Sequence, residues 1–167
     1  HPIEALVPDT RQAFANFDGI TYGKGASVLK QVAYFIGPDK FQTGVQRYFK
    51  KYAEKNTELK DFMNELSAAH GSSLEDWQKQ WLQTPSLNTV SVGVSCEKGK
   101  VTELKVTQTA PPEHPYQRAH RFRVAFFKSK GPRAEVQDVF NVRLEGGEQT
   151  VAEAVGKTCP ALTYPNY

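Results

Sequence analysis

The first half of the chain places apolar residues at helical spacing in four successive stretches. The first stretch is expected to end at Gly37-Pro38, where glycine can form the cap and proline can start the next helix. The third runs from near Thr57 to His70-Gly71, and the fourth from Ser73 to the break at Thr84-Pro85. The pattern predicts four short amphipathic helices with one shared core, as an antiparallel bundle or the helical half of something larger. Their apolar stripes are Ala26, Val28, Leu29, Val32, Phe35 and Ile36; Phe41, Val45, Tyr48, Phe49 and Tyr52; Leu59, Phe62, Met63 and Leu66; and Leu74, Trp77, Trp81 and Leu82.

The period of the pattern changes from helical to alternating near Ser86. Several short strands with polar turns and no intervening helices predict a β-sandwich. We therefore expect an α+β protein with two domains, an N-terminal antiparallel helical domain at residues 1–86 and an all-β sandwich at residues 87–167. The alternating segments are residues 89–96, 101–107, 121–127, 136–144, 149–151 and 161–164.

The composition, with 39% apolar and 23% charged residues, is that of an ordinary globular protein. A net charge of +3, with basic residues scattered among acidic ones, argues against a nucleic-acid partner. The longest apolar runs are only a few residues, which argues against a membrane partner. Our expectation for the compartment is the cytoplasm.

The two cysteines, Cys96 and Cys159, lie far apart in the sequence. They form no Cys-x-x-Cys motif, and no histidine stands near them at ligand spacing. We expect two unpaired core thiols in preference to a disulfide, and a metal site least of all.

A tyrosine bracketed by three glycines precedes the first helical stretch. Gly19, Gly23 and Gly25 supply backbone freedom, which would let Tyr22 stand on a turn with its hydroxyl outward. The helix that follows would give this turn a rigid support. A tyrosine that merely caps a helix face would explain the same residues.

Tyr22 belongs to a longer string, Phe17-Asp18-x-Ile20-x-Tyr22-x-Lys24-Gly25-Ala26-x-Val28-Leu29. This string, with weaker support from His1-Pro2-Ile3, from Asn56-Thr57 and from Trp77-x-x-x-Trp81, resembles the aminopeptidase N family of zinc metallopeptidases. In that family the tyrosine points into the active site and donates a hydrogen bond to the oxyanion formed when zinc-bound water attacks the peptide carbonyl. The resemblance implies that Tyr22 is a catalytic residue, since a neutral phenol can stabilise negative charge without adding a fixed cation. For Asp18 and Lys24 we expect structural roles.

The second half resembles the same family more loosely. Leu104-x-Val106-x-Gln108, followed by Pro111-Pro112 and a return strand, is similar to the β-sandwich domain that follows the catalytic domain in bacterial members. The resemblance implies that residues 1–86 form the helical C-terminal part of a thermolysin-like catalytic domain and that residues 87–167 form the sandwich domain.

The family's zinc motif is absent from this sequence. Such peptidases bind zinc through His-Glu-x-x-His and a further glutamate, but no His-Glu pair occurs at His1, His70, His114 or His120. With no initiator methionine either, the chain is expected to be a piece of a longer protein. The resemblance implies that the parent is an aminopeptidase that acts on peptide substrates and binds zinc through residues preceding His1. The piece itself is expected to bind no metal and to be inactive, and its substrate-binding residues are unknown.

Without a complete catalytic constellation, a non-enzymatic interaction or spacer module built from the helical and β-sandwich layers is an alternative. His1 and Glu4 are residue types that bind metals, but plain surface roles are expected for both. Carbohydrate binding by the sandwich is disfavoured, because Phe126 and Phe127 are adjacent and only one can face outward.

Overall fold

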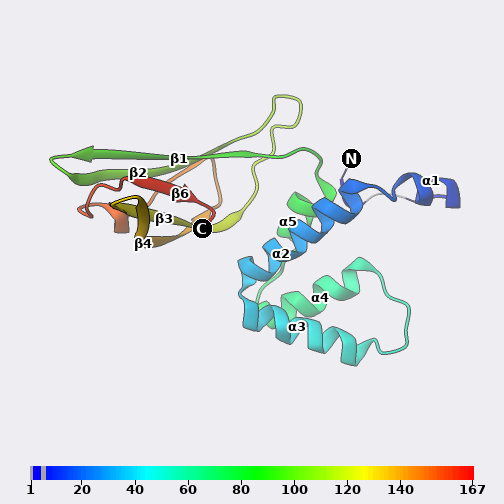
Figure 1. Cartoon of the computed structure of the whole chain (residues 1–167). Coiled ribbons are helices and arrows are strands. Elements are labelled where there is room, and N and C mark those ends of the chain that lie inside the picture. The colour runs from blue at the N-terminus through cyan, green and yellow to red at the C-terminus, as the bar shows by residue number, and fades with distance from the viewer. Residues whose placement is uncertain (1, 5–6) are drawn as a thin grey trace. The chain divides into compact units, whose positions relative to one another are not determined.

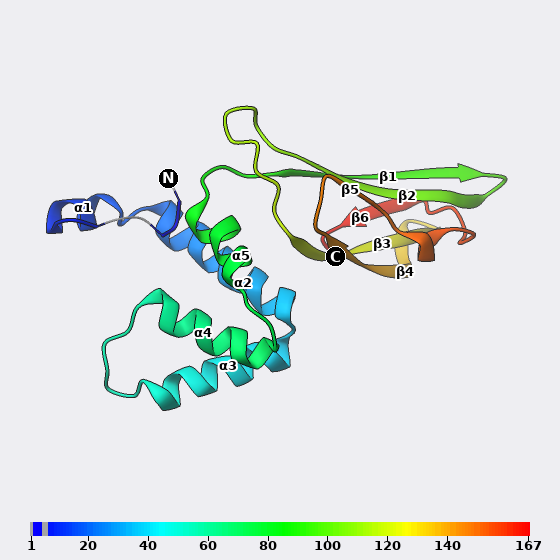
Figure 2. The same ribbon diagram turned by 180° about the vertical axis from the view of Figure 1, so that it is seen from behind.

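The computed structural model describes residues 2–4 and 7–167, which divide into two compact units, His1–Ser86 and Leu87–Tyr167. Helices make up the first unit and antiparallel strands make up the second (Figures 1 and 2). The predicted α+β fold, with a helical part followed by a β-sandwich, is confirmed. None of the helices that the structure describes has both the length and the hydropathy of a membrane-spanning segment.

The helical unit follows the predicted order, with two π-helical turns added. Gly37 ends α2 with a φ of 98°, and Pro38 occupies the first turn of α3. A capping box formed by Glu58 and Asp61 starts α4, and Gly71 ends it in the left-handed conformation. The elements are α1 (Thr10–Ala15), η1 (Ile20–Lys24, π-helical), α2 (Gly25–Ile36), α3 (Pro38–Lys51), α4 (Leu59–His70), α5 (Glu75–Gln78) and η2 (Lys79–Gln83, π-helical).

Apolar side chains from α2, α4, α5 and η2 form the core of this unit. The predicted stripes supply these side chains, but Phe49 of α3 is 67% exposed and lies outside the core. The helices α3 and α4 run side by side (Figure 1) and approach closely at Gly44, where an added Cβ would lie 2.8 Å from Leu66 Cδ2. The buried core residues are Val28, Val32, Ile36, Met63, Leu66, Leu74, Trp77, Trp81 and Leu82.

A buried carboxylate also links α3 to α4. Glu65 is 4% exposed, and its two oxygens accept hydrogen bonds from Lys51 Nζ at 2.7 Å and Arg47 Nε at 3.0 Å. The hydrogen bond from Lys51, followed by that from Arg47, outweighs burial and lowers the pKa of Glu65. Glu65 is therefore held ionised between the two helices.

The β unit contains two three-stranded antiparallel sheets, in the orders β1-β2-β5 and β4-β3-β6. Residues from both sheets form one buried core, which includes Leu104, Val106, Phe126, Phe140 and Leu144. Side chains alternate between the two faces of β3, so Phe126 is fully buried with Phe122 and Val124, while Phe127 is only partly buried. The strands are β1 (Thr89–Glu97), β2 (Lys100–Thr109), β3 (His120–Lys130), β4 (Arg133–Leu144), β5 (Glu148–Thr150) and β6 (Leu162–Pro165), and a 3₁₀ turn, η3 (Ala152–Ala154), follows β5.

The expectation of two unpaired core thiols is wrong, because Cys96 and Cys159 form a disulfide. Cys96 is exposed near the end of β1. The segment after η3 returns to the β1–β2 turn, where Cys159 N–H donates to Gly99 O at 2.9 Å and Thr158 pairs with Lys100. This return brings the two Cα atoms to 6.0 Å although 63 positions separate them in the sequence. The spacing of the two cysteines in the sequence does not indicate that the chain returns in this way.

Candidate functional site

Tyr22 lies on a π-helical turn at the start of α2. The N–H of Gly25 donates to the carbonyl of Ile20, five residues earlier, which is the hydrogen bond that defines a π-helix. The side chain of Tyr22 is 57% exposed, so the ring is not sealed in the core. Single π-helical turns inside or beside α-helices occur frequently at functional sites.

The backbone of this turn is held by side chains that precede it. Asp18 Oδ1 accepts hydrogen bonds from the N–H groups of Ile20 and Thr21, both at 2.9 Å. The hydroxyl of Thr21 donates to the carbonyl of Asn16 at 2.5 Å. From the sequence we expected a structural role for Asp18, because an acid is favoured near the start of a helix. Its spacing to Thr21 is that of a helix-capping residue and the third helical position.

The glycines around Tyr22 do not supply the backbone freedom that the sequence analysis assigned to them. Gly19 and Gly25 adopt right-handed helical conformations, with φ values of −63° and −57°. A Cβ on Gly19 or Gly23 would meet no heavy atom of the described residues within 4 Å. The π-helical turn therefore uses right-handed backbone conformations that other residues can also adopt, and the prediction that it depends on glycine is wrong.

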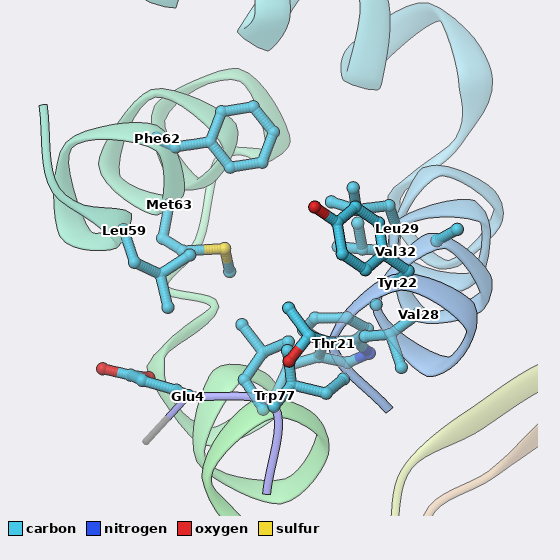
Figure 3. A pocket seen from close by; sticks show the side chains of 14 residues that line it. Glu4, Thr21, Tyr22, Val28, Leu29, Val32, Leu59, Phe62, Met63 and Trp77 are labelled. Carbon is cyan, nitrogen blue, oxygen red and sulfur yellow. The ribbon is translucent and has the colours of Figure 1, made fainter. Parts of the chain in front are cut away.

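An open hollow of about 570 Å³ adjoins Tyr22 in the helical unit. Val28 and Val32 of α2 and Leu59, Phe62 and Met63 of α4 contribute apolar side chains to its wall, together with Trp77 and Leu82. Figure 3 shows the hydroxyl of Tyr22 directed into this space, toward the side formed by Phe62 and Met63. Sequence analysis could not find the hollow, because its walls come from helices that only the tertiary structure brings together.

Glu4 lies at the edge of the hollow, and amide groups hold its carboxylate. Its Oε2 accepts from Gln83 Nε2 at 3.0 Å and from Gln78 Nε2 at 3.3 Å. Its backbone N–H donates to the carbonyl of Leu82 at 2.9 Å. These bonds attach the N-terminal segment to α5 and η2, while His1, which the sequence analysis named beside Glu4, lies outside the described residues.

The remaining histidines lie in different settings. His70 is at the C-terminal end of α4, where its carbonyl accepts from Lys40 Nζ at 2.9 Å. His120 begins β3 in the other unit, where burial, aided by the charge of Arg118, lowers the pKa of His120 to about 4. Within residues 2–4 and 7–167 no three His, Cys, Asp or Glu side chains are grouped closely enough to hold a metal ion. A zinc site therefore does not fit the side chains that the structure describes.

Comparisons with known proteins give consistent results. Residues 1–81 match the family described as the peptidase family M1 domain. Aminopeptidase N of Streptomyces lividans is 36% identical over 174 aligned residues, which cover 99% of this chain and 20% of that protein. Glutamyl aminopeptidase of Sus scrofa is 32% identical over 114 residues, covering 66% of this chain and 12% of that protein. The chain thus spans about a fifth, or less, of the length of these relatives.

A solved structure shows a similar fold. The crystal structure of Legionella pneumophila aminopeptidase A in complex with aspartic acid aligns with a TM-score of 0.59. The alignment covers 82% of this chain and 16% of that protein, at 16% sequence identity. This likeness supports the fold, and the sequence matches carry the assignment to a family.

Proposed function

We propose that this chain is part of an enzyme that removes N-terminal residues from peptides, because residues 1–81 match the peptidase family M1 domain and nearly the whole chain aligns with an aminopeptidase N. The observation that carries the proposal is the half-exposed Tyr22, whose hydroxyl is directed into an open hollow. In this proposal residues 1–86 are the helical C-terminal part of a thermolysin-like catalytic domain, and residues 87–167 are the β-sandwich domain that follows it. The family match favours the peptidase over an interaction or spacer module.

The chemical role that we propose for Tyr22 is stabilisation of negative charge. Its phenolic O–H would donate a hydrogen bond to the oxygen of the scissile carbonyl as that oxygen becomes an oxyanion. The largely apolar wall of the hollow beside the ring supports this role, because a hydrogen bond to a charged oxygen strengthens when substrate and the rest of the protein displace water from such a wall. A donor whose bond strengthens only as charge develops lowers the barrier to reaction more than it tightens substrate binding.

We further propose that these 167 residues are inactive on their own. The support is the chemistry of the side chains: the sequence contains no His-Glu-x-x-His, and the described residues offer no group of metal ligands. Zinc and the water-activating base of the parent protein would then be held by polypeptide outside this chain, and peptide substrates would bind where that polypeptide meets the hollow.

Parallel assays of the isolated chain and of the longer protein that contains it test this proposal. We expect the longer protein to contain zinc and to release N-terminal residues from aminoacyl arylamides, while the isolated chain does neither. A longer protein without zinc and without this activity would contradict the proposal and favour the interaction module.

For the compartment, the disulfide points away from the cytoplasm that the sequence alone favoured. Disulfides persist in oxidising compartments and are rare where thiols are kept reduced. We propose that the chain resides in an oxidising compartment. To test this, free thiols are alkylated while the protein is extracted from its native source, and the mass of the protein is then measured without reductant. We expect Cys96 and Cys159 to be unmodified and joined by a disulfide. Two alkylated thiols would contradict this assignment.

A further inference from the structure

We propose that Asp18 is a positioning residue for Tyr22. Its carboxylate fixes the π-helical turn in the orientation that directs the phenol into the hollow. This inference rests on the proposed function of Tyr22 and adds the group that sets the direction of its hydroxyl.

Three successive N–H groups of the turn donate to Asp18. Oδ1 accepts from Ile20 and Thr21, each at 2.9 Å, and the backbone carbonyl accepts from Tyr22 at 3.1 Å. The first N–H groups of a helix have no partners within the helix, so these bonds determine where it begins. The backbone position of Tyr22 is therefore set relative to Asp18.

Contacts with the Tyr22 ring restrain it only weakly, so the position of its backbone largely sets the direction of the side chain. The ring is 57% exposed, and the Phe17 ring, which meets it edge-on at 5.2 Å, is itself 71% exposed. Among residues 2–4 and 7–167, nothing lies within 4 Å of a Cβ built on Gly23, so a contact at the next residue does not hold the turn from that side. A catalytic donor misplaced by about 1 Å can lose on the order of a hundredfold in rate. We therefore infer that the hydrogen bonds to Asp18, more than the contacts of the Tyr22 ring, hold the phenol hydroxyl in position.

Substitutions at Asp18 can separate geometry from charge. An asparagine carries a side-chain oxygen that can accept the same two hydrogen bonds, whereas alanine cannot accept either. Asp9 offers a matched control, because its Oδ1 caps α1 by accepting from Gln12 N–H at 2.7 Å. Asp9→Ala therefore removes a cap of the same kind from a helix that does not carry Tyr22.

Amide hydrogen exchange in this chain tests the positioning without any assay of activity. We expect Asp18→Ala to accelerate exchange at Ile20 and Thr21 by about tenfold, because their acceptor is lost. Asp18→Asn should keep exchange at both amides near the wild-type rate, and Asp9→Ala should accelerate exchange near Gln12 alone. Unchanged exchange at Ile20 and Thr21 in Asp18→Ala would overturn the inference.

Steady-state kinetics of the longer peptidase test the consequence. We expect Asp18→Ala to lower kcat by about tenfold or more with little change in KM, Asp18→Asn to restore most of kcat, and Asp9→Ala to behave as wild type. If Tyr22→Phe lowers kcat but Asp18→Ala does not, the positioning role is wrong and the function of Tyr22 stands. If Asp18→Asn is as slow as Asp18→Ala, the loss of kcat comes from the lost charge of Asp18 and not from lost hydrogen bonds to the turn, and the positioning role is wrong. If Tyr22→Phe leaves kcat unchanged, the proposed function itself fails.

Discussion

Two glycines within helices of the first unit have opposite surroundings. A Cβ on Gly23 would meet no heavy atom within 4 Å, whereas a Cβ on Gly44 would lie 2.8 Å from Leu66 Cδ2 and 3.2 Å from the carbonyl oxygen of Glu65. Gly44 therefore permits α3 and α4 to approach, and Gly23 serves no packing purpose within the part of the chain that the structure describes.

This contrast predicts substitutions of opposite sign. Gly23→Ala should raise the free energy of unfolding by about 0.5–1 kcal/mol, because alanine favours the helix and the space is free. Gly44→Ala should lower it by about 1–3 kcal/mol, because the helices must separate to admit the methyl group. Denaturant unfolding followed by fluorescence measures both, since Trp77 and Trp81 lie in this unit. Equal effects of the two substitutions would contradict the packing argument.

At the scale of single residues, contiguous motifs could be interpreted from the sequence and distant partners could not. The role proposed for Tyr22 came from a string of thirteen positions, residues 17–29, that carries the resemblance to the family. The Cys96–Cys159 bond depends on a return of the chain from a distant segment, and the sequence analysis predicted it wrongly. The explanation offered for the glycines also failed, because a right-handed helical backbone accepts glycine without requiring it.

Among elements, the pair α3 and α4 depends on Glu65. This carboxylate is 4% exposed and is paired with Lys51 and Arg47, whose side chains are more than half exposed. Because these partners lower its pKa, Glu65 contributes stability that is complete above its usual value of 4.5 and is lost as the pH falls through the lowered pKa of the folded state.

Glu65→Gln tests this contribution. At neutral pH the substitution should lower the free energy of unfolding of the helical unit by about 1–3 kcal/mol, because a hydrogen-bonded charge is lost from a buried position. Below about pH 4.5 the difference between wild type and variant should shrink as Glu65 takes up a proton. Tryptophan-monitored unfolding over this range measures it, and a difference that stays constant with pH would contradict the proposed pairing.

Most boundaries of the elements could be predicted because their signals are local. Gly37-Pro38 and His70-Gly71 end α2 and α4 as expected, and the alternation of β1 to β4 matches the strands to within a few residues. The π-helical turns at Ile20–Lys24 and Lys79–Gln83 were not predicted. Each adds one residue to a helical turn. Trp81 and Leu82 follow Trp77 by four and five residues, a spacing that α-helical and π-helical turns both place on one side, so periodicity does not distinguish the two.

At the scale of the whole chain, the disulfide belongs to one compact unit only. It joins Cys96 of β1 to Cys159 after η3, both within Leu87–Tyr167, and it closes a long loop. A cross-link of this span restricts the unfolded chain more than a short one does. The disulfide should therefore raise the free energy of unfolding of the sandwich and leave that of the helical unit unchanged.

Replacing both cysteines by serine should lower the free energy of unfolding of the sandwich by about 2–4 kcal/mol. The tryptophan signal of the helical unit should be unchanged, while the β signal in circular dichroism should be lost at lower denaturant concentration. A shift of both signals together, or of neither, would contradict a bond whose effect is confined to this unit.

The sequence also predicted the α+β order of the chain, but it could not show the hollow beside Tyr22. That hollow forms where α2, α4 and the N-terminal segment meet, and it is open to solvent. The chain spans about a fifth of the length of a relative. Periodicity assigns residues to a buried face, but it does not say whether that face is fully covered.

The most direct measurement is the kinetics of Tyr22→Phe in the longer protein that contains this chain, assayed for the proposed peptidase activity. The account predicts that kcat falls by about 10²–10³ while KM changes little, because the lost hydroxyl acts mainly in the transition state. A variant whose kcat matches that of the wild-type enzyme would show that this phenol takes no part in the reaction.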